Sequence, residues 1–272
     1  MLKRTFSTIV LWGLALGCAR YFGATGGVWL VTAVSVLTLN EFYAMLRRMG
    51  LSPFIRLGLT FGAAITLAPC YFEPYFTPPE LLALAVIVFS VRILGEREPQ
   101  NRIETLGWTL FGLVYVPFML HFLVRIILIS RPHQFSGLVL ALWLIAVTKF
   151  CDSGAFLTGL AIGRHKLAPN ISPKKTWEGV VGGMLTAVVV GATLAWGCRG
   201  YLPANFTPLF GAVMAVPLAG LAIVSDLVES IIKRRADTKD TGRSIPGIGG
   251  MFDLIDSVIL TAPIGWAVFH LL

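Results

Sequence analysis

Long runs of apolar residues, separated by short polar connections, dominate this chain of 272 residues. A helix that crosses a bilayer needs about 20 mainly apolar residues, with a range of about 17–25. Nine runs approach this length, so the pattern predicts an all-α, polytopic integral membrane protein with about nine transmembrane helices. The runs lie near residues 5–22, 27–46, 56–73, 79–95, 105–127, 136–160, 176–198, 208–232 and 252–271.

The composition supports this prediction. Hydrophobic residues make up 56% of the chain and charged residues only 13%, whereas soluble domains carry about 25% charged residues. We therefore expect one continuous membrane domain, with N-terminal transmembrane helices at 1–135 and C-terminal helices, which carry the polar motifs, at 136–272. The 4 cysteines are scattered through apolar runs, a pattern that favours neither a zinc site nor a disulfide framework.

Positively charged residues gather on alternate connections. Most of the 22 lysines and arginines lie before the first run or in every second connection. Because such residues mark the cytoplasmic side, the bias predicts a cytoplasmic N-terminus in a cell inner (plasma) membrane. A basic face suits anionic phospholipid, but basic residues scattered among spans do not favour nucleic acid as a partner. The sequence is compatible with a homo-oligomer.

The eighth run carries charges where charges are costly, by about 2.5–3.5 kcal/mol each on membrane-insertion scales. Asp226, Glu229, Ser230 and Lys233 follow the spacing i, i+3, i+4, i+7, which places all four on one helical stripe. One interpretation is an internally paired patch, with Glu229 and Lys233 as an ion pair. The other is a functional site, since pairing alone does not require additional buried carboxylates.

The connection after the eighth run combines cations with glycines. Arg234 and Lys239 supply positive charge that can bind phosphate. Gly249 and Gly250 would let the backbone approach a ligand closely. A glycine-rich loop can also be a simple turn, but this one lies between two runs that both carry carboxylates.

Two carboxylates open the ninth run. Asp253 and Asp256 are spaced i, i+3 and would share one helix face. With Asp226 and Asp240 they offer oxygen ligands that suit Mg²⁺, which often completes its coordination shell with water and substrate phosphate. Helix N-capping is the competing interpretation for Asp253 and Asp256, but it does not account for the other two aspartates.

A second polar stretch, at residues 170–179, connects the sixth and seventh runs. Ser172 or Thr176 can cap the seventh helix, whose N-terminus would then favour an anion. Lys174 and Lys175 add positive charge at the same place. The competing interpretation is a positively charged membrane anchor with an interfacial tryptophan.

The spacing Ser230-x-x-Lys233-Arg234-x-x-x-x-Lys239-Asp240-x-Gly242-x-x-Ile245-Pro246-x-x-Gly249-Gly250-Met251-x-Asp253-x-x-Asp256 resembles the signature of phosphatidate cytidylyltransferases, also called CDP-diacylglycerol synthases. The stretch at 170–179 is similar to a second motif of that family. Two positions depart from the family pattern: Ile248 stands where it usually has His, and Leu254 where it usually has Arg.

The resemblance implies a Mg²⁺-dependent membrane enzyme with CTP and phosphatidate as partners. Such an enzyme transfers a cytidylyl group to phosphatidate, giving CDP-diacylglycerol and pyrophosphate in phospholipid biosynthesis. The catalytic residues expected on this basis are Asp226, Lys233, Lys239, Asp240 and Asp253. The expected substrate-binding residues are Ser172, Lys174, Lys175, Thr176, Ser230, Arg234, Gly249 and Gly250. The expected metal ligands are Asp226, Asp240, Asp253 and Asp256.

Four other functions compete with this one. A polyprenol or phytol kinase would transfer the γ-phosphoryl group of CTP, and an ether-lipid cytidylyltransferase would use another lipid. A non-catalytic scaffold or a transporter would belong to a different class. A transporter should carry polar groups near mid-membrane in several spans, and the third to fifth runs have almost none.

Overall fold

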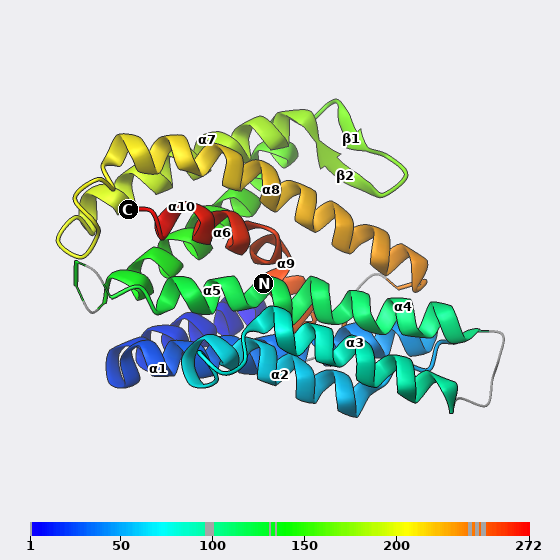
Figure 1. Ribbon diagram of the computed structural model, residues 1–272. Coiled ribbons are helices and arrows are strands. Elements are labelled where there is room, and N and C mark those ends of the chain that lie inside the picture. Colours follow the sequence, from blue (N-terminus) through cyan, green and yellow to red (C-terminus); the bar gives the residue numbers. More distant parts are fainter. Residues whose placement is uncertain are drawn as a thin grey trace. The chain divides into compact units, whose positions relative to one another are not determined.

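Figure 1 shows the computed structural model, which describes residues 2–95, 101–130, 132–133, 135–238, 241–242, 245 and 249–272, with the backbone alone at 2–12, 14–16 and 19. The helices are α1 (Leu2–Arg48), α2 (Ile55–Tyr71), α3 (Pro78–Leu94), α4 (Arg102–Leu113), the π-helix η2 (Val114–Phe118), α5 (Met119–Ile127), α6 (Ser136–Ile162), α7 (Trp177–Gly197), α8 (Pro208–Arg235), α9 (Met251–Ile259) and α10 (Thr261–Phe269). One antiparallel hairpin, β1 (Lys166–Ala168) and β2 (Ser172–Thr176), precedes α7. The predicted all-α class is confirmed, and the apolar pattern did not indicate the hairpin.

Five helical segments of the described chain are long and apolar enough to cross a membrane: Arg20–Arg48, Arg102–Ile127, Ser136–Ile162, Trp177–Gly197 and Pro208–Arg235. Helices α9 and α10, bent by 43° at the break between them, would make a sixth. The polytopic membrane class therefore holds, but the prediction of nine spans is not confirmed.

The difference in number has local causes. The first two predicted runs lie in the single helix α1, which is kinked at Gly23 (φ 57°). Helices α2 and α3 have 17 residues each, which is the lower limit for crossing the hydrocarbon core. Apolar length therefore indicated where helices form more reliably than how many of them span the membrane.

Close packing divides the chain into two compact units. Unit 1 comprises residues 1–125 and 233–255, and unit 2 comprises 126–232 and 256–272. The chain passes from one unit to the other within α5, within α8 and within α9. One continuous membrane domain, with a division near residue 135, stays a prediction.

In unit 1, α1 packs beside α2 and α4, and α2 packs beside α3 (Figure 1). An aromatic core joins these helices to the start of α9: the ring centroids of Phe42 and Phe252 lie 6.2 Å apart, and those of Tyr115 and Phe252 also 6.2 Å apart. Tyr43 donates a hydrogen bond to the carbonyl of Thr109 at 3.1 Å. The first turn of α9 is thus fixed to the N-terminal helices by buried aromatic contacts.

In unit 2, α6 and α7 lie against each other, and α10 also packs on α6. Small residues allow this approach: a Cβ atom at Gly183 would lie 2.7 Å from the carbonyl oxygen of Cys151. The hairpin leads directly into α7, with Lys166 opposite Thr176. The Thr176 side chain accepts a hydrogen bond from the Gly179 N–H at 3.1 Å, so the predicted cap at Thr176 is confirmed.

Candidate active site

Three carboxylates meet inside unit 2. One oxygen each of Asp226, Glu229 and Asp256 lies within 4.8 Å of the other two. Glu229 is 1% exposed and Asp256 is 7% exposed, while Asp226 is half-buried. Asp226 and Glu229 lie one turn apart on α8, as the i, i+3 spacing predicted, and Asp256 comes from α9. We call these three residues the acidic cluster.

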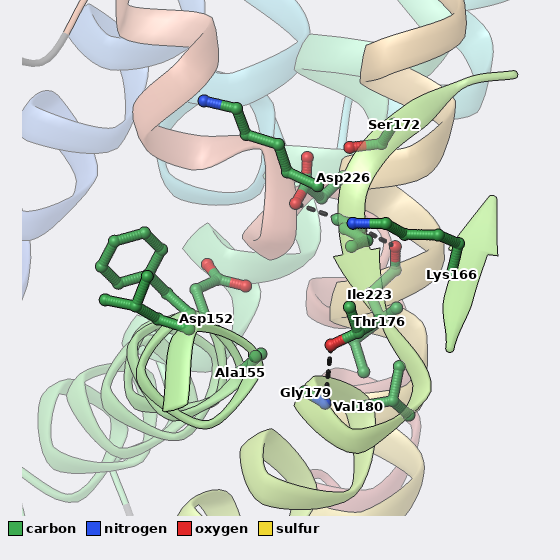
Figure 2. A pocket seen from close by; sticks show the side chains of 14 residues that line it. Asp152, Ala155, Lys166, Ser172, Thr176, Gly179, Val180, Ile223 and Asp226 are labelled. Carbon is green, nitrogen blue, oxygen red and sulfur yellow. Dashed lines mark hydrogen bonds and ion pairs between the residues drawn. The ribbon is translucent and has the colours of Figure 1, made fainter. Parts of the chain in front are cut away.

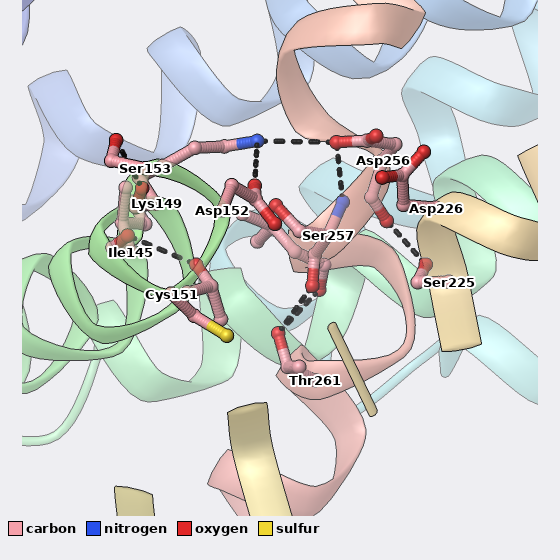
Figure 3. Close-up of polar contacts among 12 residues, drawn as sticks. Ile145, Lys149, Cys151, Asp152, Ser153, Ser225, Asp226, Asp256, Ser257 and Thr261 are labelled. Carbon is pink, nitrogen blue, oxygen red and sulfur yellow. Dashed lines mark hydrogen bonds and ion pairs between the residues drawn. The ribbon is translucent and has the colours of Figure 1, made fainter. Parts of the chain in front are cut away.

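A lysine on α6 contacts the acidic cluster. The Lys149 ammonium lies 3.1 Å from Asp256 Oδ1 and 3.3 Å from Asp152 Oδ2 (Figure 3). The Ser257 N–H donates to Asp256 Oδ1 at 2.6 Å, and the Ser225 hydroxyl donates to the backbone carbonyl of Asp256. Asp256 is therefore held from α6, α8 and α9, with part of its charge offset by Lys149.

A cavity of about 540 Å³ opens beside this cluster in unit 2. Figure 2 shows that Asp152 from α6, Lys166 and Ser172 from the hairpin, and Asp226 from α8 line it. The Lys175 ammonium lies 2.7 Å from Asp226 Oδ2. The remaining lining residues are Ala155, Phe156, Gly159, Leu160, Lys174, Lys175, Thr176, Gly179, Val180 and Ile223.

Two kinds of chemistry thus share one cavity. Three lysines, two carboxylates, Ser172 and Thr176 form its polar side, and α6, α7 and α8 supply the apolar side. Lysine ammonium groups bind phosphate oxygens, and an apolar wall accommodates hydrocarbon. The structure brings together all four residues predicted to bind substrate from the hairpin region, Ser172, Lys174, Lys175 and Thr176, on the wall of this cavity.

The acidic cluster has the donor set of a magnesium site. Its three potential ligands are all carboxylates, and Mg²⁺ prefers oxygen ligands at about 2.0–2.1 Å, so that ligand oxygens on opposite sides lie about 4 Å apart. The three oxygens lie within 4.8 Å of one another, so rotation of these side chains can bring them into one coordination shell. The residues therefore fit a divalent cation, which Asp226, Glu229 and Asp256 would hold.

The structure includes a carboxylate that the predicted ligand set omitted. Glu229 lies on the polar stripe of α8 and is absent from the predicted ligand set. Its i, i+3 spacing from Asp226 is the sequence feature that indicates it as a ligand. Lys149 and Asp152 also lacked a proposed role. Their signal was the presence of charges inside an apolar run.

The predicted residues of unit 1 have different surroundings. Asp253 accepts four hydrogen bonds: from the Lys233 ammonium at 2.9 Å, from the Thr241 N–H at 3.1 Å and hydroxyl at 2.8 Å, and from the Gly250 N–H at 2.8 Å. Gly249, with φ 130°, forms a β-bridge with Ile245. Asp253 thus caps the N-terminus of α9 and forms an ion pair with Lys233. Its role as a metal ligand stays a prediction.

The remaining predicted residues are Ser230, Arg234, Lys239 and Asp240. Ser230 is half-buried on α8, and Arg234 is exposed in the last turn of that helix. Lys239 and Asp240 lie outside the described residues, as does Ile248, one of the two departures from the family pattern. Their predicted roles stay predictions.

Comparison with known proteins identifies relatives along the chain. A family model described as the cytidylyltransferase family matches residues 2–272. A phosphatidate cytidylyltransferase of Thermotoga maritima is 32% identical over 207 residues, which cover 74% of this chain and 72% of the relative. One of Synechocystis is 28% identical over 285 residues, covering 95% of this chain and 89% of the relative. One of Mycobacterium bovis is 33% identical over 181 residues, covering 65% of this chain and 55% of the relative.

Proposed function

The chain belongs to the cytidylyltransferase family, and we propose that it transfers the cytidylyl group of CTP to phosphatidate. In this reaction a phosphate oxygen of phosphatidate attacks the α-phosphorus of CTP. A new P–O bond forms, the bond from the α-phosphorus to the bridging oxygen breaks, and pyrophosphate leaves with that electron pair. The products are CDP-diacylglycerol and pyrophosphate.

The cavity of unit 2 is the observation that carries this proposal. The substrates of the proposed reaction are a nucleoside triphosphate and a lipid phosphate. A site for them must offset many negative charges and also accept hydrocarbon. The cavity offers Lys166, Lys174 and Lys175 on the hairpin side and apolar side chains such as Phe156 and Leu160 on α6. A purely soluble substrate would not require the apolar wall.

The lysines have two tasks in this mechanism. They offset the repulsion between the phosphate groups of the two substrates, and they bind the phosphate oxygens on which charge gathers as pyrophosphate leaves. Lys175 is already oriented by Asp226 and by the carbonyl of Ile223, which its ammonium contacts at 3.3 Å. Positioning and charge compensation, rather than covalent chemistry, are what the protein supplies.

No general base is needed for the attack. A phosphate monoester has a second pKa near 6, so its oxygens are largely unprotonated at neutral pH and can act as the nucleophile. The carboxylates of the site are then available to hold a cation. This division of roles agrees with a site that contains several carboxylates and lysines but, among its lining residues, no histidine.

Mg²⁺ is part of the proposal. Asp226, Glu229 and Asp256 would hold it, and a bound Mg²⁺ neutralises phosphate charge and helps to align attacking and leaving oxygens. Asp240 and Asp253 remain candidates from the motif. The basic alternate connections support a bacterial inner-membrane location in which the N-terminus and the site face the cytoplasm.

The labelled position of CTP distinguishes the proposed function from its rivals. Purified protein in detergent is given Mg²⁺, phosphatidate and CTP labelled either at the α- or at the γ-phosphate. We expect α-label in the lipid product and γ-label in pyrophosphate. A polyprenol or phytol kinase, given its own alcohol as acceptor, would instead place γ-label in the lipid. An ether-lipid enzyme, given the ether-linked lipid phosphate beside phosphatidate, would prefer the ether-linked one. A scaffold would produce neither.

A matched pair of variants links the activity to the site. Asp226→Asn should abolish lipid labelling, because it removes a carboxylate from both the acidic cluster and the Lys175 ion pair. Asp237→Asn removes the same charge from an exposed residue with φ 48°, a left-handed conformation that asparagine adopts readily. Asp237→Asn should therefore keep wild-type turnover. Full activity of Asp226→Asn would contradict the placement of the reaction at this cavity.

A further inference from the structure

A buried carboxylate in unit 1 has not yet been given a role in the reaction described above. Glu41 lies in α1, within the membrane-spanning segment Arg20–Arg48, and is 7% exposed. An ionisable side chain inside a span is costly and is retained mainly where it pairs or functions. The family signature lies in the C-terminal part of the chain, so it gives no reason for a glutamate at this position.

The carboxylate of Glu41 reaches a distant part of the sequence. Glu41 Oε2 accepts a hydrogen bond from the Phe252 N–H at 3.0 Å, and it lies 3.3 Å from the Thr241 hydroxyl. Phe252 belongs to the first turn of α9, whose N–H groups have no partner within the helix. A negative charge at this end of a helix is also favoured by the helix dipole. Glu41 therefore caps α9 from another helix.

Two glycines of the signature pack directly on this carboxylate. A Cβ atom at Gly242 would lie 2.6 Å from Glu41 Oε1, and one at Gly250 would lie 2.4 Å from Glu41 Oε2. Both distances are shorter than van der Waals contact, so a larger side chain at either position would displace the carboxylate or the backbone. The chain is thus held against Glu41 at both ends of the segment 242–250.

The same carboxylate is coupled to Asp253. The Thr241 hydroxyl lies 2.8 Å from Asp253 Oδ2 and 3.3 Å from Glu41 Oε2, so its single proton is shared between two acceptors. Asp253 in turn pairs with Lys233 at 2.9 Å. Glu41, Thr241, Asp253 and Lys233 form one connected polar network, and three of these four residues belong to or adjoin the signature.

We propose that Glu41 is a positioning residue for the cytidylyl transfer, because it fixes the segment from Thr241 to Phe252 at both ends. This inference rests on the proposed function. Glu41 touches neither substrate nor metal in this role; it determines where Thr241, Gly250 and Phe252 lie. The role requires an acceptor oxygen at the reach of a glutamate, because the contacts with Phe252 and Thr241 are hydrogen bonds.

Three substitutions separate reach from charge. Glu41→Gln keeps an acceptor oxygen at the same reach and should retain kcat within about threefold. Glu41→Asp keeps the charge but is one methylene shorter, and Glu41→Ala removes the acceptor; both should lower kcat about 10- to 100-fold, the range expected for a lost hydrogen bond to a charged group. Glu104→Gln, at an exposed residue of α4, is the matched control and should leave kcat unchanged.

Hydrogen exchange supplies a readout that does not depend on activity. In Glu41→Asp, peptides covering residues 241–252 should exchange faster than in the wild type, while peptides of the hairpin at 166–176 should not change. In Glu41→Gln both regions should resemble the wild type. If Glu41→Ala fails to fold, Glu41→Asp still tests the proposal, because it keeps a carboxylate in the buried site.

The outcomes distinguish this inference from the proposed function. Unchanged exchange at 241–252 in Glu41→Asp would overturn the positioning role, and so would a Glu41→Gln protein as impaired as Glu41→Asp. If the wild type does not label phosphatidate, the proposed function fails. In that case the exchange measurements still report whether Glu41 holds the segment.

Discussion

Lys149 should be essential to the stability of unit 2, because it is the cation between two carboxylates inside an apolar helix. The substitution Lys149→Met keeps an unbranched apolar side chain of similar length. It removes the ammonium group that Asp152 and Asp256 contact. The two contacts are 3.3 and 3.1 Å long, and the Lys149 side chain is 26% exposed. At an effective dielectric constant of about 20, each pair has a gross attraction of about 5 kcal/mol.

The net effect is smaller than this gross attraction because ammonium and carboxylates are partly desolvated. Breaking a fully buried ion pair costs about 3–5 kcal/mol, and the partial exposure of Lys149 and Asp152 favours the lower limit, about 3 kcal/mol. For a chain of this size each kcal/mol corresponds to about 2–4 °C in melting temperature. We therefore expect Lys149→Met to lower the melting temperature by about 6–12 °C.

The assay is thermal unfolding of detergent-purified protein without added divalent cation. Lys149→Met/Asp152→Asn should recover part of the lost stability, because the second substitution removes one of the two carboxylates left without their cation. Lys166→Met, at an exposed lysine of the hairpin, controls for the loss of a positive charge. A Lys149→Met protein that melts within about 1 °C of the wild type, or a double variant no more stable than Lys149→Met, would refute the reasoning.

Three further predictions test the acidic cluster, the cavity and the packing. Glu229→Gln should lower Mn²⁺ affinity at least about tenfold in an electron paramagnetic resonance titration, because it removes a charged oxygen from the cluster; unchanged affinity would exclude Glu229 from the ligand set. Lys175→Met should raise the KM for CTP about tenfold, as expected for one lost charge-assisted contact, and steady-state kinetics with Lys175→Arg as the charge-retaining comparison measure this. Gly183→Val should destabilise the protein by about 1–3 kcal/mol through overpacking against α6. Gly107→Ala is the control and should not destabilise it, because a Cβ atom there meets nothing within 4 Å. Equal melting temperatures of Gly183→Val and the wild type would contradict the close contact of α6 and α7.

The helices themselves could be predicted from the sequence because helix formation in a membrane depends on local apolar length. Each predicted apolar run overlaps a helix of the structure. The number of spans was harder, because it depends on single residues such as Gly23 and on helices of 17 residues at the limit of the required length. The hairpin was not predicted, since its two strands of 3 and 5 residues are too short and polar to produce an alternating pattern.

The site shows the same division between local and distant information. The pairing of Asp226 with Glu229 follows from positions one turn apart on a helix, so spacing alone could indicate it. Thr176 as a cap is local in the same sense. In contrast, Glu41 and Thr241 are separated by 200 positions, and no periodicity relates them. Only the packing of α1 against the start of α9 explains why a glutamate is found there.

Asp253 and Asp256 show why shared spacing does not establish a shared role. Both lie on α9, three residues apart, and the sequence assigned both to the metal. Asp253 accepts hydrogen bonds from Thr241, Gly250 and Lys233, whereas Asp256 contacts Lys149 and belongs to the acidic cluster. Periodicity reveals which residues share a helix face, but the neighbours that each residue meets decide its chemistry. A carboxylate with four hydrogen-bond donors around it has little capacity left for a cation, so we expect Asp256→Asn to weaken Mn²⁺ binding more than Asp253→Asn does.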